Sequence, residues 1–138
     1  MFFEAKLRVE KTLDTGEQKE VKEHYIMDAE LFAEAEKMMF ELYPNQKIDV
    51  FSIGRSDIRE IINKKEDDKP FFKATVIDVF TDDETGKEKE TKYYMLVCAE
   101  NTVEATLLVN EYLKQGYNLR LDGIKRVKII DYLPYQPA

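Results

Sequence analysis

Apolar and polar side chains alternate along residues 3–10, with the apolar ones at positions 3, 5, 7 and 9. A period of two residues is typical of a β-strand with one buried face. A polar segment follows, and its Gly16 can adopt positive φ, which favours a tight hairpin turn. Residues 20–27 predict the returning strand. Its last apolar residues lose the alternation, as expected of a strand covered on both faces.

After Asp28 the period of the apolar residues becomes helical. Positions 31, 35, 38 and 42 fall on one stripe of a helix, and Asp28 is placed to cap its first turn. Pro44 ends this helix. The segment KIDVFSIG, residues 47–54, then predicts a third strand. The order is therefore strand, hairpin, strand, helix, strand.

The same order is written a second time. Residues 2–43 align with residues 71–113 when Glu84 is treated as one extra residue in the second turn. Identical pairs occur in strand, turn and helix alike, including Phe2/Phe71, Gly16/Gly86 and Ala35/Ala105. Asn101 followed by Glu104 predicts a capped start for the second helix, and LRLDGIKRVKII, residues 119–130, predicts its third strand. The chain therefore contains an internal repeat.

The repeat predicts an α+β protein. Two tandem duplicated strand-hairpin-strand-helix-strand (ββαβ) units are expected to form antiparallel sheet packed with two helices. The first ββαβ repeat is expected to cover residues 1–66 and the second to cover residues 67–138. The charged segment Asn63–Pro70 is expected to connect them without an apolar anchor. Because one unit has little core of its own, we expect one compact domain with pseudo-twofold symmetry.

Composition narrows the class of protein. The chain has 138 residues, is 43% hydrophobic and 36% charged, and carries a formal net charge of −7. This composition is globular, and the negative charge repels phosphate backbones at long range. The single cysteine, Cys98, excludes an internal disulfide and fits a reducing cytoplasm. No run of about 20 apolar residues predicts a membrane span.

Candidate catalytic chemistry is sparse, so the sequence predicts a protein that is not an enzyme. His24 is the only histidine, and Cys98 therefore has no second histidine to serve a nucleophilic triad. The acidic residues Asp82–Glu84 lack the spacing of a calcium loop, and no glycine-rich phosphate loop is present. We expect neither a metal nor another cofactor.

Aromatic and basic residues are the best candidates for a binding site. Each of the pairs Phe71–Phe72 and Tyr93–Tyr94 sends one ring to each face of the sheet, because neighbouring strand residues alternate. A ring outside the core is either exposed or covered by a partner, and exposed sheet aromatics flanked by basic residues can stack single-stranded bases. The six predicted nucleic-acid-binding residues are Arg55, Phe71, Tyr93, Tyr94, Arg126 and Lys128.

Two of these residues, Arg55 and Arg126, occupy equivalent positions in the two repeats. Related by the expected pseudo-twofold, they would be placed to hold a phosphate backbone. The alternative is structural: basic residues on a strand edge protect that edge from aggregation, and rings on both sheet faces can be buried by packing.

The segments FFEAKLRVEKTLDTGEQKEVKEHYIMDA, near the start, and IIDYLP, near the end, resemble a domain family of unknown function. Its marks include a Tyr-x-x-Asp-Ala step into the helix, here Tyr25–Ala29, and an Asp-x-x-Pro tail, here Asp131–Pro134. The resemblance covers nearly the whole chain and implies a protein of Bacteroidota, their phages or their mobile elements. It carries over no catalytic residue.

The sequence leaves two functions open. The first is a non-enzymatic phage or mobile-element protein of the host cytoplasm that binds single-stranded nucleic acid. The second is a protein–protein interaction module, acting as a homo-oligomer such as a homodimer or as an inhibitor of a host protein, because strand edges can accept a partner strand. Neither function involves a membrane.

Overall fold

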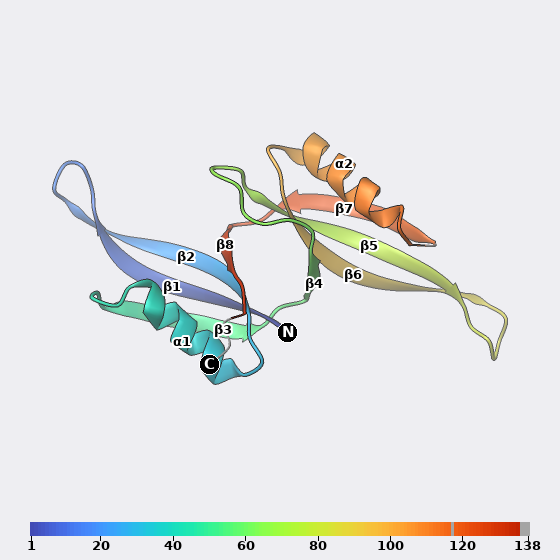
Figure 1. Ribbon diagram of the computed structural model, residues 1–138, viewed down its shortest axis with the longest axis horizontal. Helices are drawn as coiled ribbons and strands as arrows, with labels where there is room; N and C mark the ends of the chain where they lie inside the picture. Colours follow the sequence, from blue (N-terminus) through green and yellow to red (C-terminus); the bar gives the residue numbers. More distant parts are fainter. Residues whose placement is uncertain (117, 136–138) are drawn as a thin grey trace. The chain divides into compact units, whose positions relative to one another are not determined.

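The computed structural model describes residues 1–116 and 118–135, which form two compact units. The first unit contains β1 (Phe2–Thr12), β2 (Gln18–Asp28), α1 (Phe32–Leu42), β3 (Ile48–Arg55) and β8 (Ile129–Leu133). The second contains β4 (Ile58–Ile61), β5 (Phe71–Thr81), β6 (Glu88–Cys98), α2 (Thr102–Leu113) and β7 (Leu119–Arg126). Each unit is a four-stranded sheet with one helix on one face (Figure 1). The predicted α+β class with two helices is confirmed.

The two sheets have the same topology. Their strand orders are β3-β1-β2-β8 and, read from the opposite edge, β7-β5-β6-β4. In each, a long antiparallel hairpin forms the centre, the third strand of the same repeat pairs antiparallel on one side, and a short strand pairs parallel on the other. Gly16 and Gly86 take φ of +85° and +69° in the two hairpin turns. This is the backbone conformation that the sequence predicted there.

The short fourth strands are exchanged between the repeats. β4 follows the third strand of the first repeat but pairs with β6 in the second unit. β8 follows the third strand of the second repeat but pairs with β2 in the first unit. Sequence reasoning gave each repeat three strands and merged β7 with β8. The sequence repeats and the compact units therefore divide the chain at different places. The repeats were expected to meet between residues 66 and 67, whereas the units meet at 56/57 and at 128/129.

Irregularities in the sheets fall at equivalent places in both repeats. Phe51 is the extra residue in β3 where its pairing with β1 shifts, and Asp122 is the extra residue in β7. In the parallel pairs, the extra residues are Ile130 and Arg59. Bulges are specific features of a fold rather than defects, so their repetition supports the duplication read from the sequence.

Each helix packs on the sheet of its own unit. In the first unit the core joins β1, β2 and α1; in the second it joins β5, β6 and α2. Asn101 caps α2, with its Oδ1 accepting a hydrogen bond from the Glu104 N–H at 2.9 Å. The predicted cap at Asp28 is wrong, because Asp28 ends β2 and its carboxylate pairs with the N-terminal ammonium. Helix α1 begins after Leu31 without a side-chain cap.

The connector between the repeats is anchored through polar contacts. The Asn63 side chain donates to the Cys98 carbonyl at 2.7 Å and accepts from the Cys98 N–H at 2.6 Å. The Glu66 N–H also donates to the Cys98 sulfur at 3.3 Å. Cys98 is buried at the end of β6, so these contacts hold the connector against that end of the second sheet.

Candidate functional site

The predicted stacking ring Phe71 is not available at the surface. It pairs with Cys98 on the face of the second sheet opposite α2, yet it is 0% exposed. Both Phe71 and its neighbour Phe72 are therefore buried, and the prediction that Phe71 contacts a base is corrected. The connector lies over this part of the sheet, because the Glu66 N–H and the Lys69 carbonyl both contact the sulfur of Cys98, the cross-strand partner of Phe71.

Tyr93 and Tyr94 point to opposite faces of the second sheet, as alternation predicted. Tyr93 packs against the core beneath α2, and the Arg59 guanidinium lies 4.6 Å from its ring centroid. Tyr94 lies on the other face, with the Lys73 ammonium 4.2 Å from its ring centroid. Tyr94 lines a surface pocket, so it is the better candidate for a ligand contact.

The predicted arginines occupy equivalent positions in different units. Arg55 ends β3 opposite Phe3, and Arg126 ends β7 opposite Phe72. Both are exposed, as is Lys128 in the segment that leaves β7. Each unit therefore presents one arginine at the same end of its third strand, and joint action of the two on one phosphate backbone remains a prediction.

The pocket that Tyr94 lines is a hollow of about 340 Å³ across β5, β6 and β7. Lys73 and Thr75 contribute from β5, Gly123 and Lys125 from β7. Lys73 and Lys125 are direct cross-strand partners, so their side chains project from the same face of the sheet. The hollow is open at Gly123, where a Cβ would meet no atom within 4 Å.

The charge of this pocket is positive. Two lysines placed directly opposite each other on a sheet repel. The Lys73 ammonium is partly compensated by Asp57, whose two carboxylate oxygens each lie 2.9 Å from it. Lys125 is exposed and forms no ion pair with any residue that the structure describes. The pocket therefore combines the free ammonium of Lys125 with the Tyr94 ring that the Lys73 ammonium contacts, a combination that suits an anionic, planar ligand.

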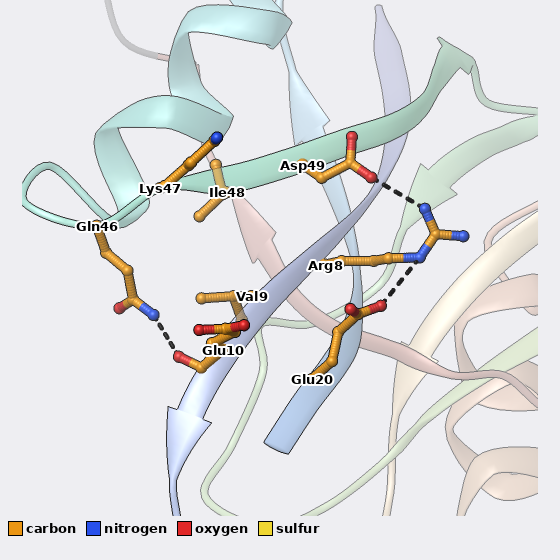
Figure 2. A pocket seen from close by; sticks show the side chains of 8 residues that line it. All are labelled: Arg8, Val9, Glu10, Glu20, Gln46, Lys47, Ile48 and Asp49. Atoms are coloured by element: carbon orange, nitrogen blue, oxygen red, sulfur yellow. Dashed lines mark hydrogen bonds and ion pairs between the residues drawn. The ribbon is translucent and has the colours of Figure 1, made fainter. Parts of the chain in front are cut away.

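A second hollow of about 320 Å³ lies on the first unit near the start of β3. Figure 2 shows that Arg8 is held there between two carboxylates. Its Nη1 lies 3.0 Å from Asp49 and its Nε 3.4 Å from Glu20. The guanidinium also stacks 4.0 Å from the Phe51 ring centroid. The arginine is already neutralised and stacked. Lys47 also lines this hollow, but the lining carries three carboxylates, those of Glu10, Glu20 and Asp49, so the hollow disfavours an anion.

The first unit also contains a buried carboxylate. Glu23 is 5% exposed and accepts hydrogen bonds from the hydroxyls of Tyr25, at 3.0 Å, and Tyr43. The Lys11 ammonium lies 2.7 Å from its other oxygen. Burial raises the pKa of Glu23, but the hydrogen bonds from Lys11, Tyr43 and Tyr25 outweigh burial and hold the pKa below its usual value. All of its oxygens are engaged, so this network joins β1, β2 and the end of α1 and has no open ligand position.

Sequence reasoning missed Lys73 and Lys125, although it found Tyr94. They are 52 positions apart by residue number, and only the register between β5 and β7 brings them together. The one available signal was Gly123, because a glycine inside a predicted strand marks a bulge or an approach by another molecule.

Comparison with known proteins places the chain in a family. Residues 1–135 match the family described as Domain of unknown function (DUF4494), and the chain belongs to it. The search of the curated proteins and the search of the solved structures gave no match.

Two further features bear on the class of site. Within residues 1–116 and 118–135, no helix is long and apolar enough to cross a membrane. Across the same residues, no three histidine, cysteine, aspartate or glutamate side chains gather in a way that would hold a metal ion. The basic pocket on the second unit combines two lysines with an aromatic ring among its lining residues.

Proposed function

We propose that this protein is a non-enzymatic binding protein that holds single-stranded nucleic acid on the second unit. The observation that carries the proposal is the pocket on β5, β6 and β7, where Lys73 and Lys125 face each other beside Tyr94. A base would stack on the Tyr94 ring in place of the Lys73 ammonium that lies over it, and the flanking phosphates would contact the two ammonium groups. Arg126, the partner of Phe72, projects from the other face of the sheet, and Lys128 is exposed beyond the end of β7.

The size and charge of the pocket support this assignment. Its volume of about 340 Å³ lies at the small end of the range for ligand pockets, which suits one nucleotide at a time. A phosphate would also relieve the repulsion between the two opposed lysines. The net charge of −7 opposes binding at long range. We therefore expect modest affinity that falls as salt is added.

The proposal includes the setting that the sequence resemblance implies. The protein would act in the cytoplasm of a bacterial host, as part of a phage or mobile element of Bacteroidota. Single-stranded nucleic acid is produced whenever such elements replicate or transfer as single strands, which gives a binding protein of this kind a ligand.

Fluorescence anisotropy with a labelled single strand of about 30 nucleotides tests the proposal at low and at physiological salt. The wild type is expected to bind, with a linear dependence of log affinity on log salt. Lys73→Ala combined with Lys125→Ala should lower affinity at least tenfold and flatten that slope. The matched control, Lys19→Ala with Lys22→Ala, removes the same charge from exposed positions of the first unit and should change affinity little. Flat anisotropy of the wild type at both salts would rule the proposal out.

Tyr94 provides a test of stacking that is separate from charge. Replacing it with leucine should lower affinity for a single strand about 5- to 150-fold, because stacking on an aromatic ring contributes ~1–3 kcal/mol per base. The neighbouring substitution Tyr93→Leu is the control, since Tyr93 packs beneath α2. Equal losses for the two variants, measured by anisotropy on samples with matched circular dichroism spectra, would contradict stacking on Tyr94.

Asp57 is expected to weaken binding in the wild type. Its carboxylate holds the Lys73 ammonium, so a phosphate must compete with it. Asp57→Asn should raise affinity several-fold in the same assay, because a charged partner is removed while the side-chain shape is kept. Asp49→Asn, which alters an exposed ion pair of the first unit, is the control and should leave affinity unchanged. Unchanged affinity for Asp57→Asn would show that Lys73 does not contact phosphate.

Protein–protein interaction is a second candidate, favoured by a different surface. Helix α1 and the residue before it carry three exposed apolar side chains, Leu31, Phe32 and Phe40. Exposed apolar residues grouped on one element are typical of an interface, here one between two copies of the chain. Sedimentation should then show a concentration-dependent dimer that Phe32→Ser with Phe40→Ser abolishes. A monomer at all concentrations would leave an inhibitor of a host protein as the remaining form of this candidate.

A further inference from the structure

The pocket on the second unit has a counterpart in the first unit, at positions fixed by the repeat. Lys73 pairs with Lys125 in the second sheet, and Glu4 pairs with Gly54 at the same register in the first. Tyr94 is the cross-strand partner of Thr75, and His24 is the partner of Lys6. The two faces can therefore be compared position by position.

The same diagonal contact exists in both sheets, with different chemistry. In the second sheet the Lys73 ammonium lies over the Tyr94 ring. In the first sheet the Glu4 carboxylate lies 2.8 Å from His24 Nε2, and its other oxygen accepts a hydrogen bond from the Ser56 hydroxyl. Where the second sheet has a lysine–tyrosine pair, the first sheet has a glutamate–histidine pair. The Glu4 carboxylate takes the position of the Lys73 ammonium and repels phosphate.

We infer that three positions decide which repeat binds nucleic acid, so that each chain has one site despite its duplication. The binding set is Lys73, Tyr94 and Lys125; the non-binding set is Glu4, His24 and Gly54. This inference rests on the proposed function and adds the residues that determine its specificity. Gly54 matters as much as the other two, because a glycine leaves the first sheet without the second ammonium that a phosphate would contact.

The backbone of the first sheet can accept the missing side chain. A Cβ built at Gly54 would meet no atom within 4 Å, and the φ of this residue is not in the left-handed region. Lysine at this position would therefore enter open space beside β1. The combination Glu4→Lys, His24→Tyr and Gly54→Lys should install a second site.

The experiment is a stoichiometric titration with a single strand of about six nucleotides, short enough to occupy one site. The wild type should bind one equivalent and the triple variant two. Adding Lys73→Glu and Lys125→Gly to the triple variant should return it to one equivalent, now on the first unit, whereas these two changes alone should abolish binding. Glu17→Lys with Gln18→Lys, at exposed hairpin positions, adds the same charge as the triple variant and should leave one equivalent.

The outcomes separate this inference from the proposed function. Absence of binding by the wild type would overturn the proposed function and this inference with it. One equivalent for a folded triple variant, or two for the wild type, would overturn the inference alone. Should the triple variant not fold, lysine acetylation of the wild type with and without oligonucleotide gives the answer. Protection of Lys73 and Lys125 but not of Lys6 supports a single site, and equal protection of Lys6 overturns it.

Discussion

Ile129→Asp is expected to destabilise the first sheet by about 4 kcal/mol, although Ile129 belongs to the second repeat. Ile129 is buried and pairs with His24 in the parallel β2–β8 ladder. An unpartnered carboxylate there loses the apolar contacts and must be desolvated. Hydrogen exchange should show the loss first in the amides of β2, which lie some hundred residues earlier in the chain.

Ile130 is a matched control for this change. It is the neighbouring residue on the same strand but is 39% exposed, and it is the extra residue where the β2–β8 pairing shifts. Ile130→Asp should cost less than about 1 kcal/mol. In the reciprocal experiment, Ile58→Asp in the first repeat should raise exchange in β6, its partner in the second sheet. If Ile129→Asp raised exchange in β7 while β2 stayed protected, the strand exchange would be wrong.

Glu23→Ala is expected to lower the free energy of unfolding of the first unit by about 2–3 kcal/mol. The change leaves two tyrosine hydroxyls, from Tyr25 and Tyr43, without their shared acceptor. Buried donors without a partner keep their full cost of desolvation. Chemical denaturation followed by tyrosine fluorescence measures the loss. Glu20→Ala, an exposed position on the same strand, should cost less than about 0.5 kcal/mol, and equal costs for the two would refute the network.

The same carboxylate predicts a dependence of stability on pH. The folded pKa of Glu23 lies below its unfolded value. The ionised carboxylate of Glu23 therefore stabilises the folded state relative to the unfolded chain. Its contribution is present above the unfolded value of about 4.3 and is lost as pH falls through the folded pKa. Glu23→Gln should therefore flatten the acid limb of the stability profile, measured as denaturation midpoints between about pH 2 and 6. An acid limb as steep as that of the wild type would contradict this assignment.

Alkaline pH should act on the tyrosine side of the network. Burial, followed by the negative charge of Glu23, raises the pKa of Tyr25. Because the unfolded chain releases this proton more easily than the folded one, the stabilising contribution is present below the unfolded value of about 10 and is lost as pH rises above it. Tyr25→Phe should weaken this alkaline loss while keeping the ring in the core.

Much of the fold follows from local patterns. The hairpins were predicted from alternation and from Gly16 and Gly86, and α2 from the internal repeat and the Asn101 cap. These features depend on neighbouring residues, so sequence reports them directly. The exchange of β4 and β8 does not, because strands of four and five residues are too short to show a period and their partners lie in the other repeat. Both strands begin with an isoleucine, Ile58 in β4 and Ile129 in β8.

The site was predicted less completely, for the same reason. Tyr94 could be proposed because aromatic pairs on a strand must reach both faces. Phe71 could not be distinguished from it, since alternation gives the face of a side chain but not what covers that face. Lys73 and Lys125 become neighbours only through the β5–β7 register, including the shift that follows Thr75, and no local pattern contains that register.

The most direct test of nucleic-acid binding is a map of amide chemical shifts during titration with a single-stranded oligonucleotide. The largest changes should cluster at Lys73, Thr75, Tyr94, Gly123 and Lys125, and their size should fall as salt is added. The equivalent amides of the first sheet, from Glu4, Lys6 and His24, should move little. Changes confined to α1, or no changes at low salt, would contradict a nucleic-acid site on the second unit.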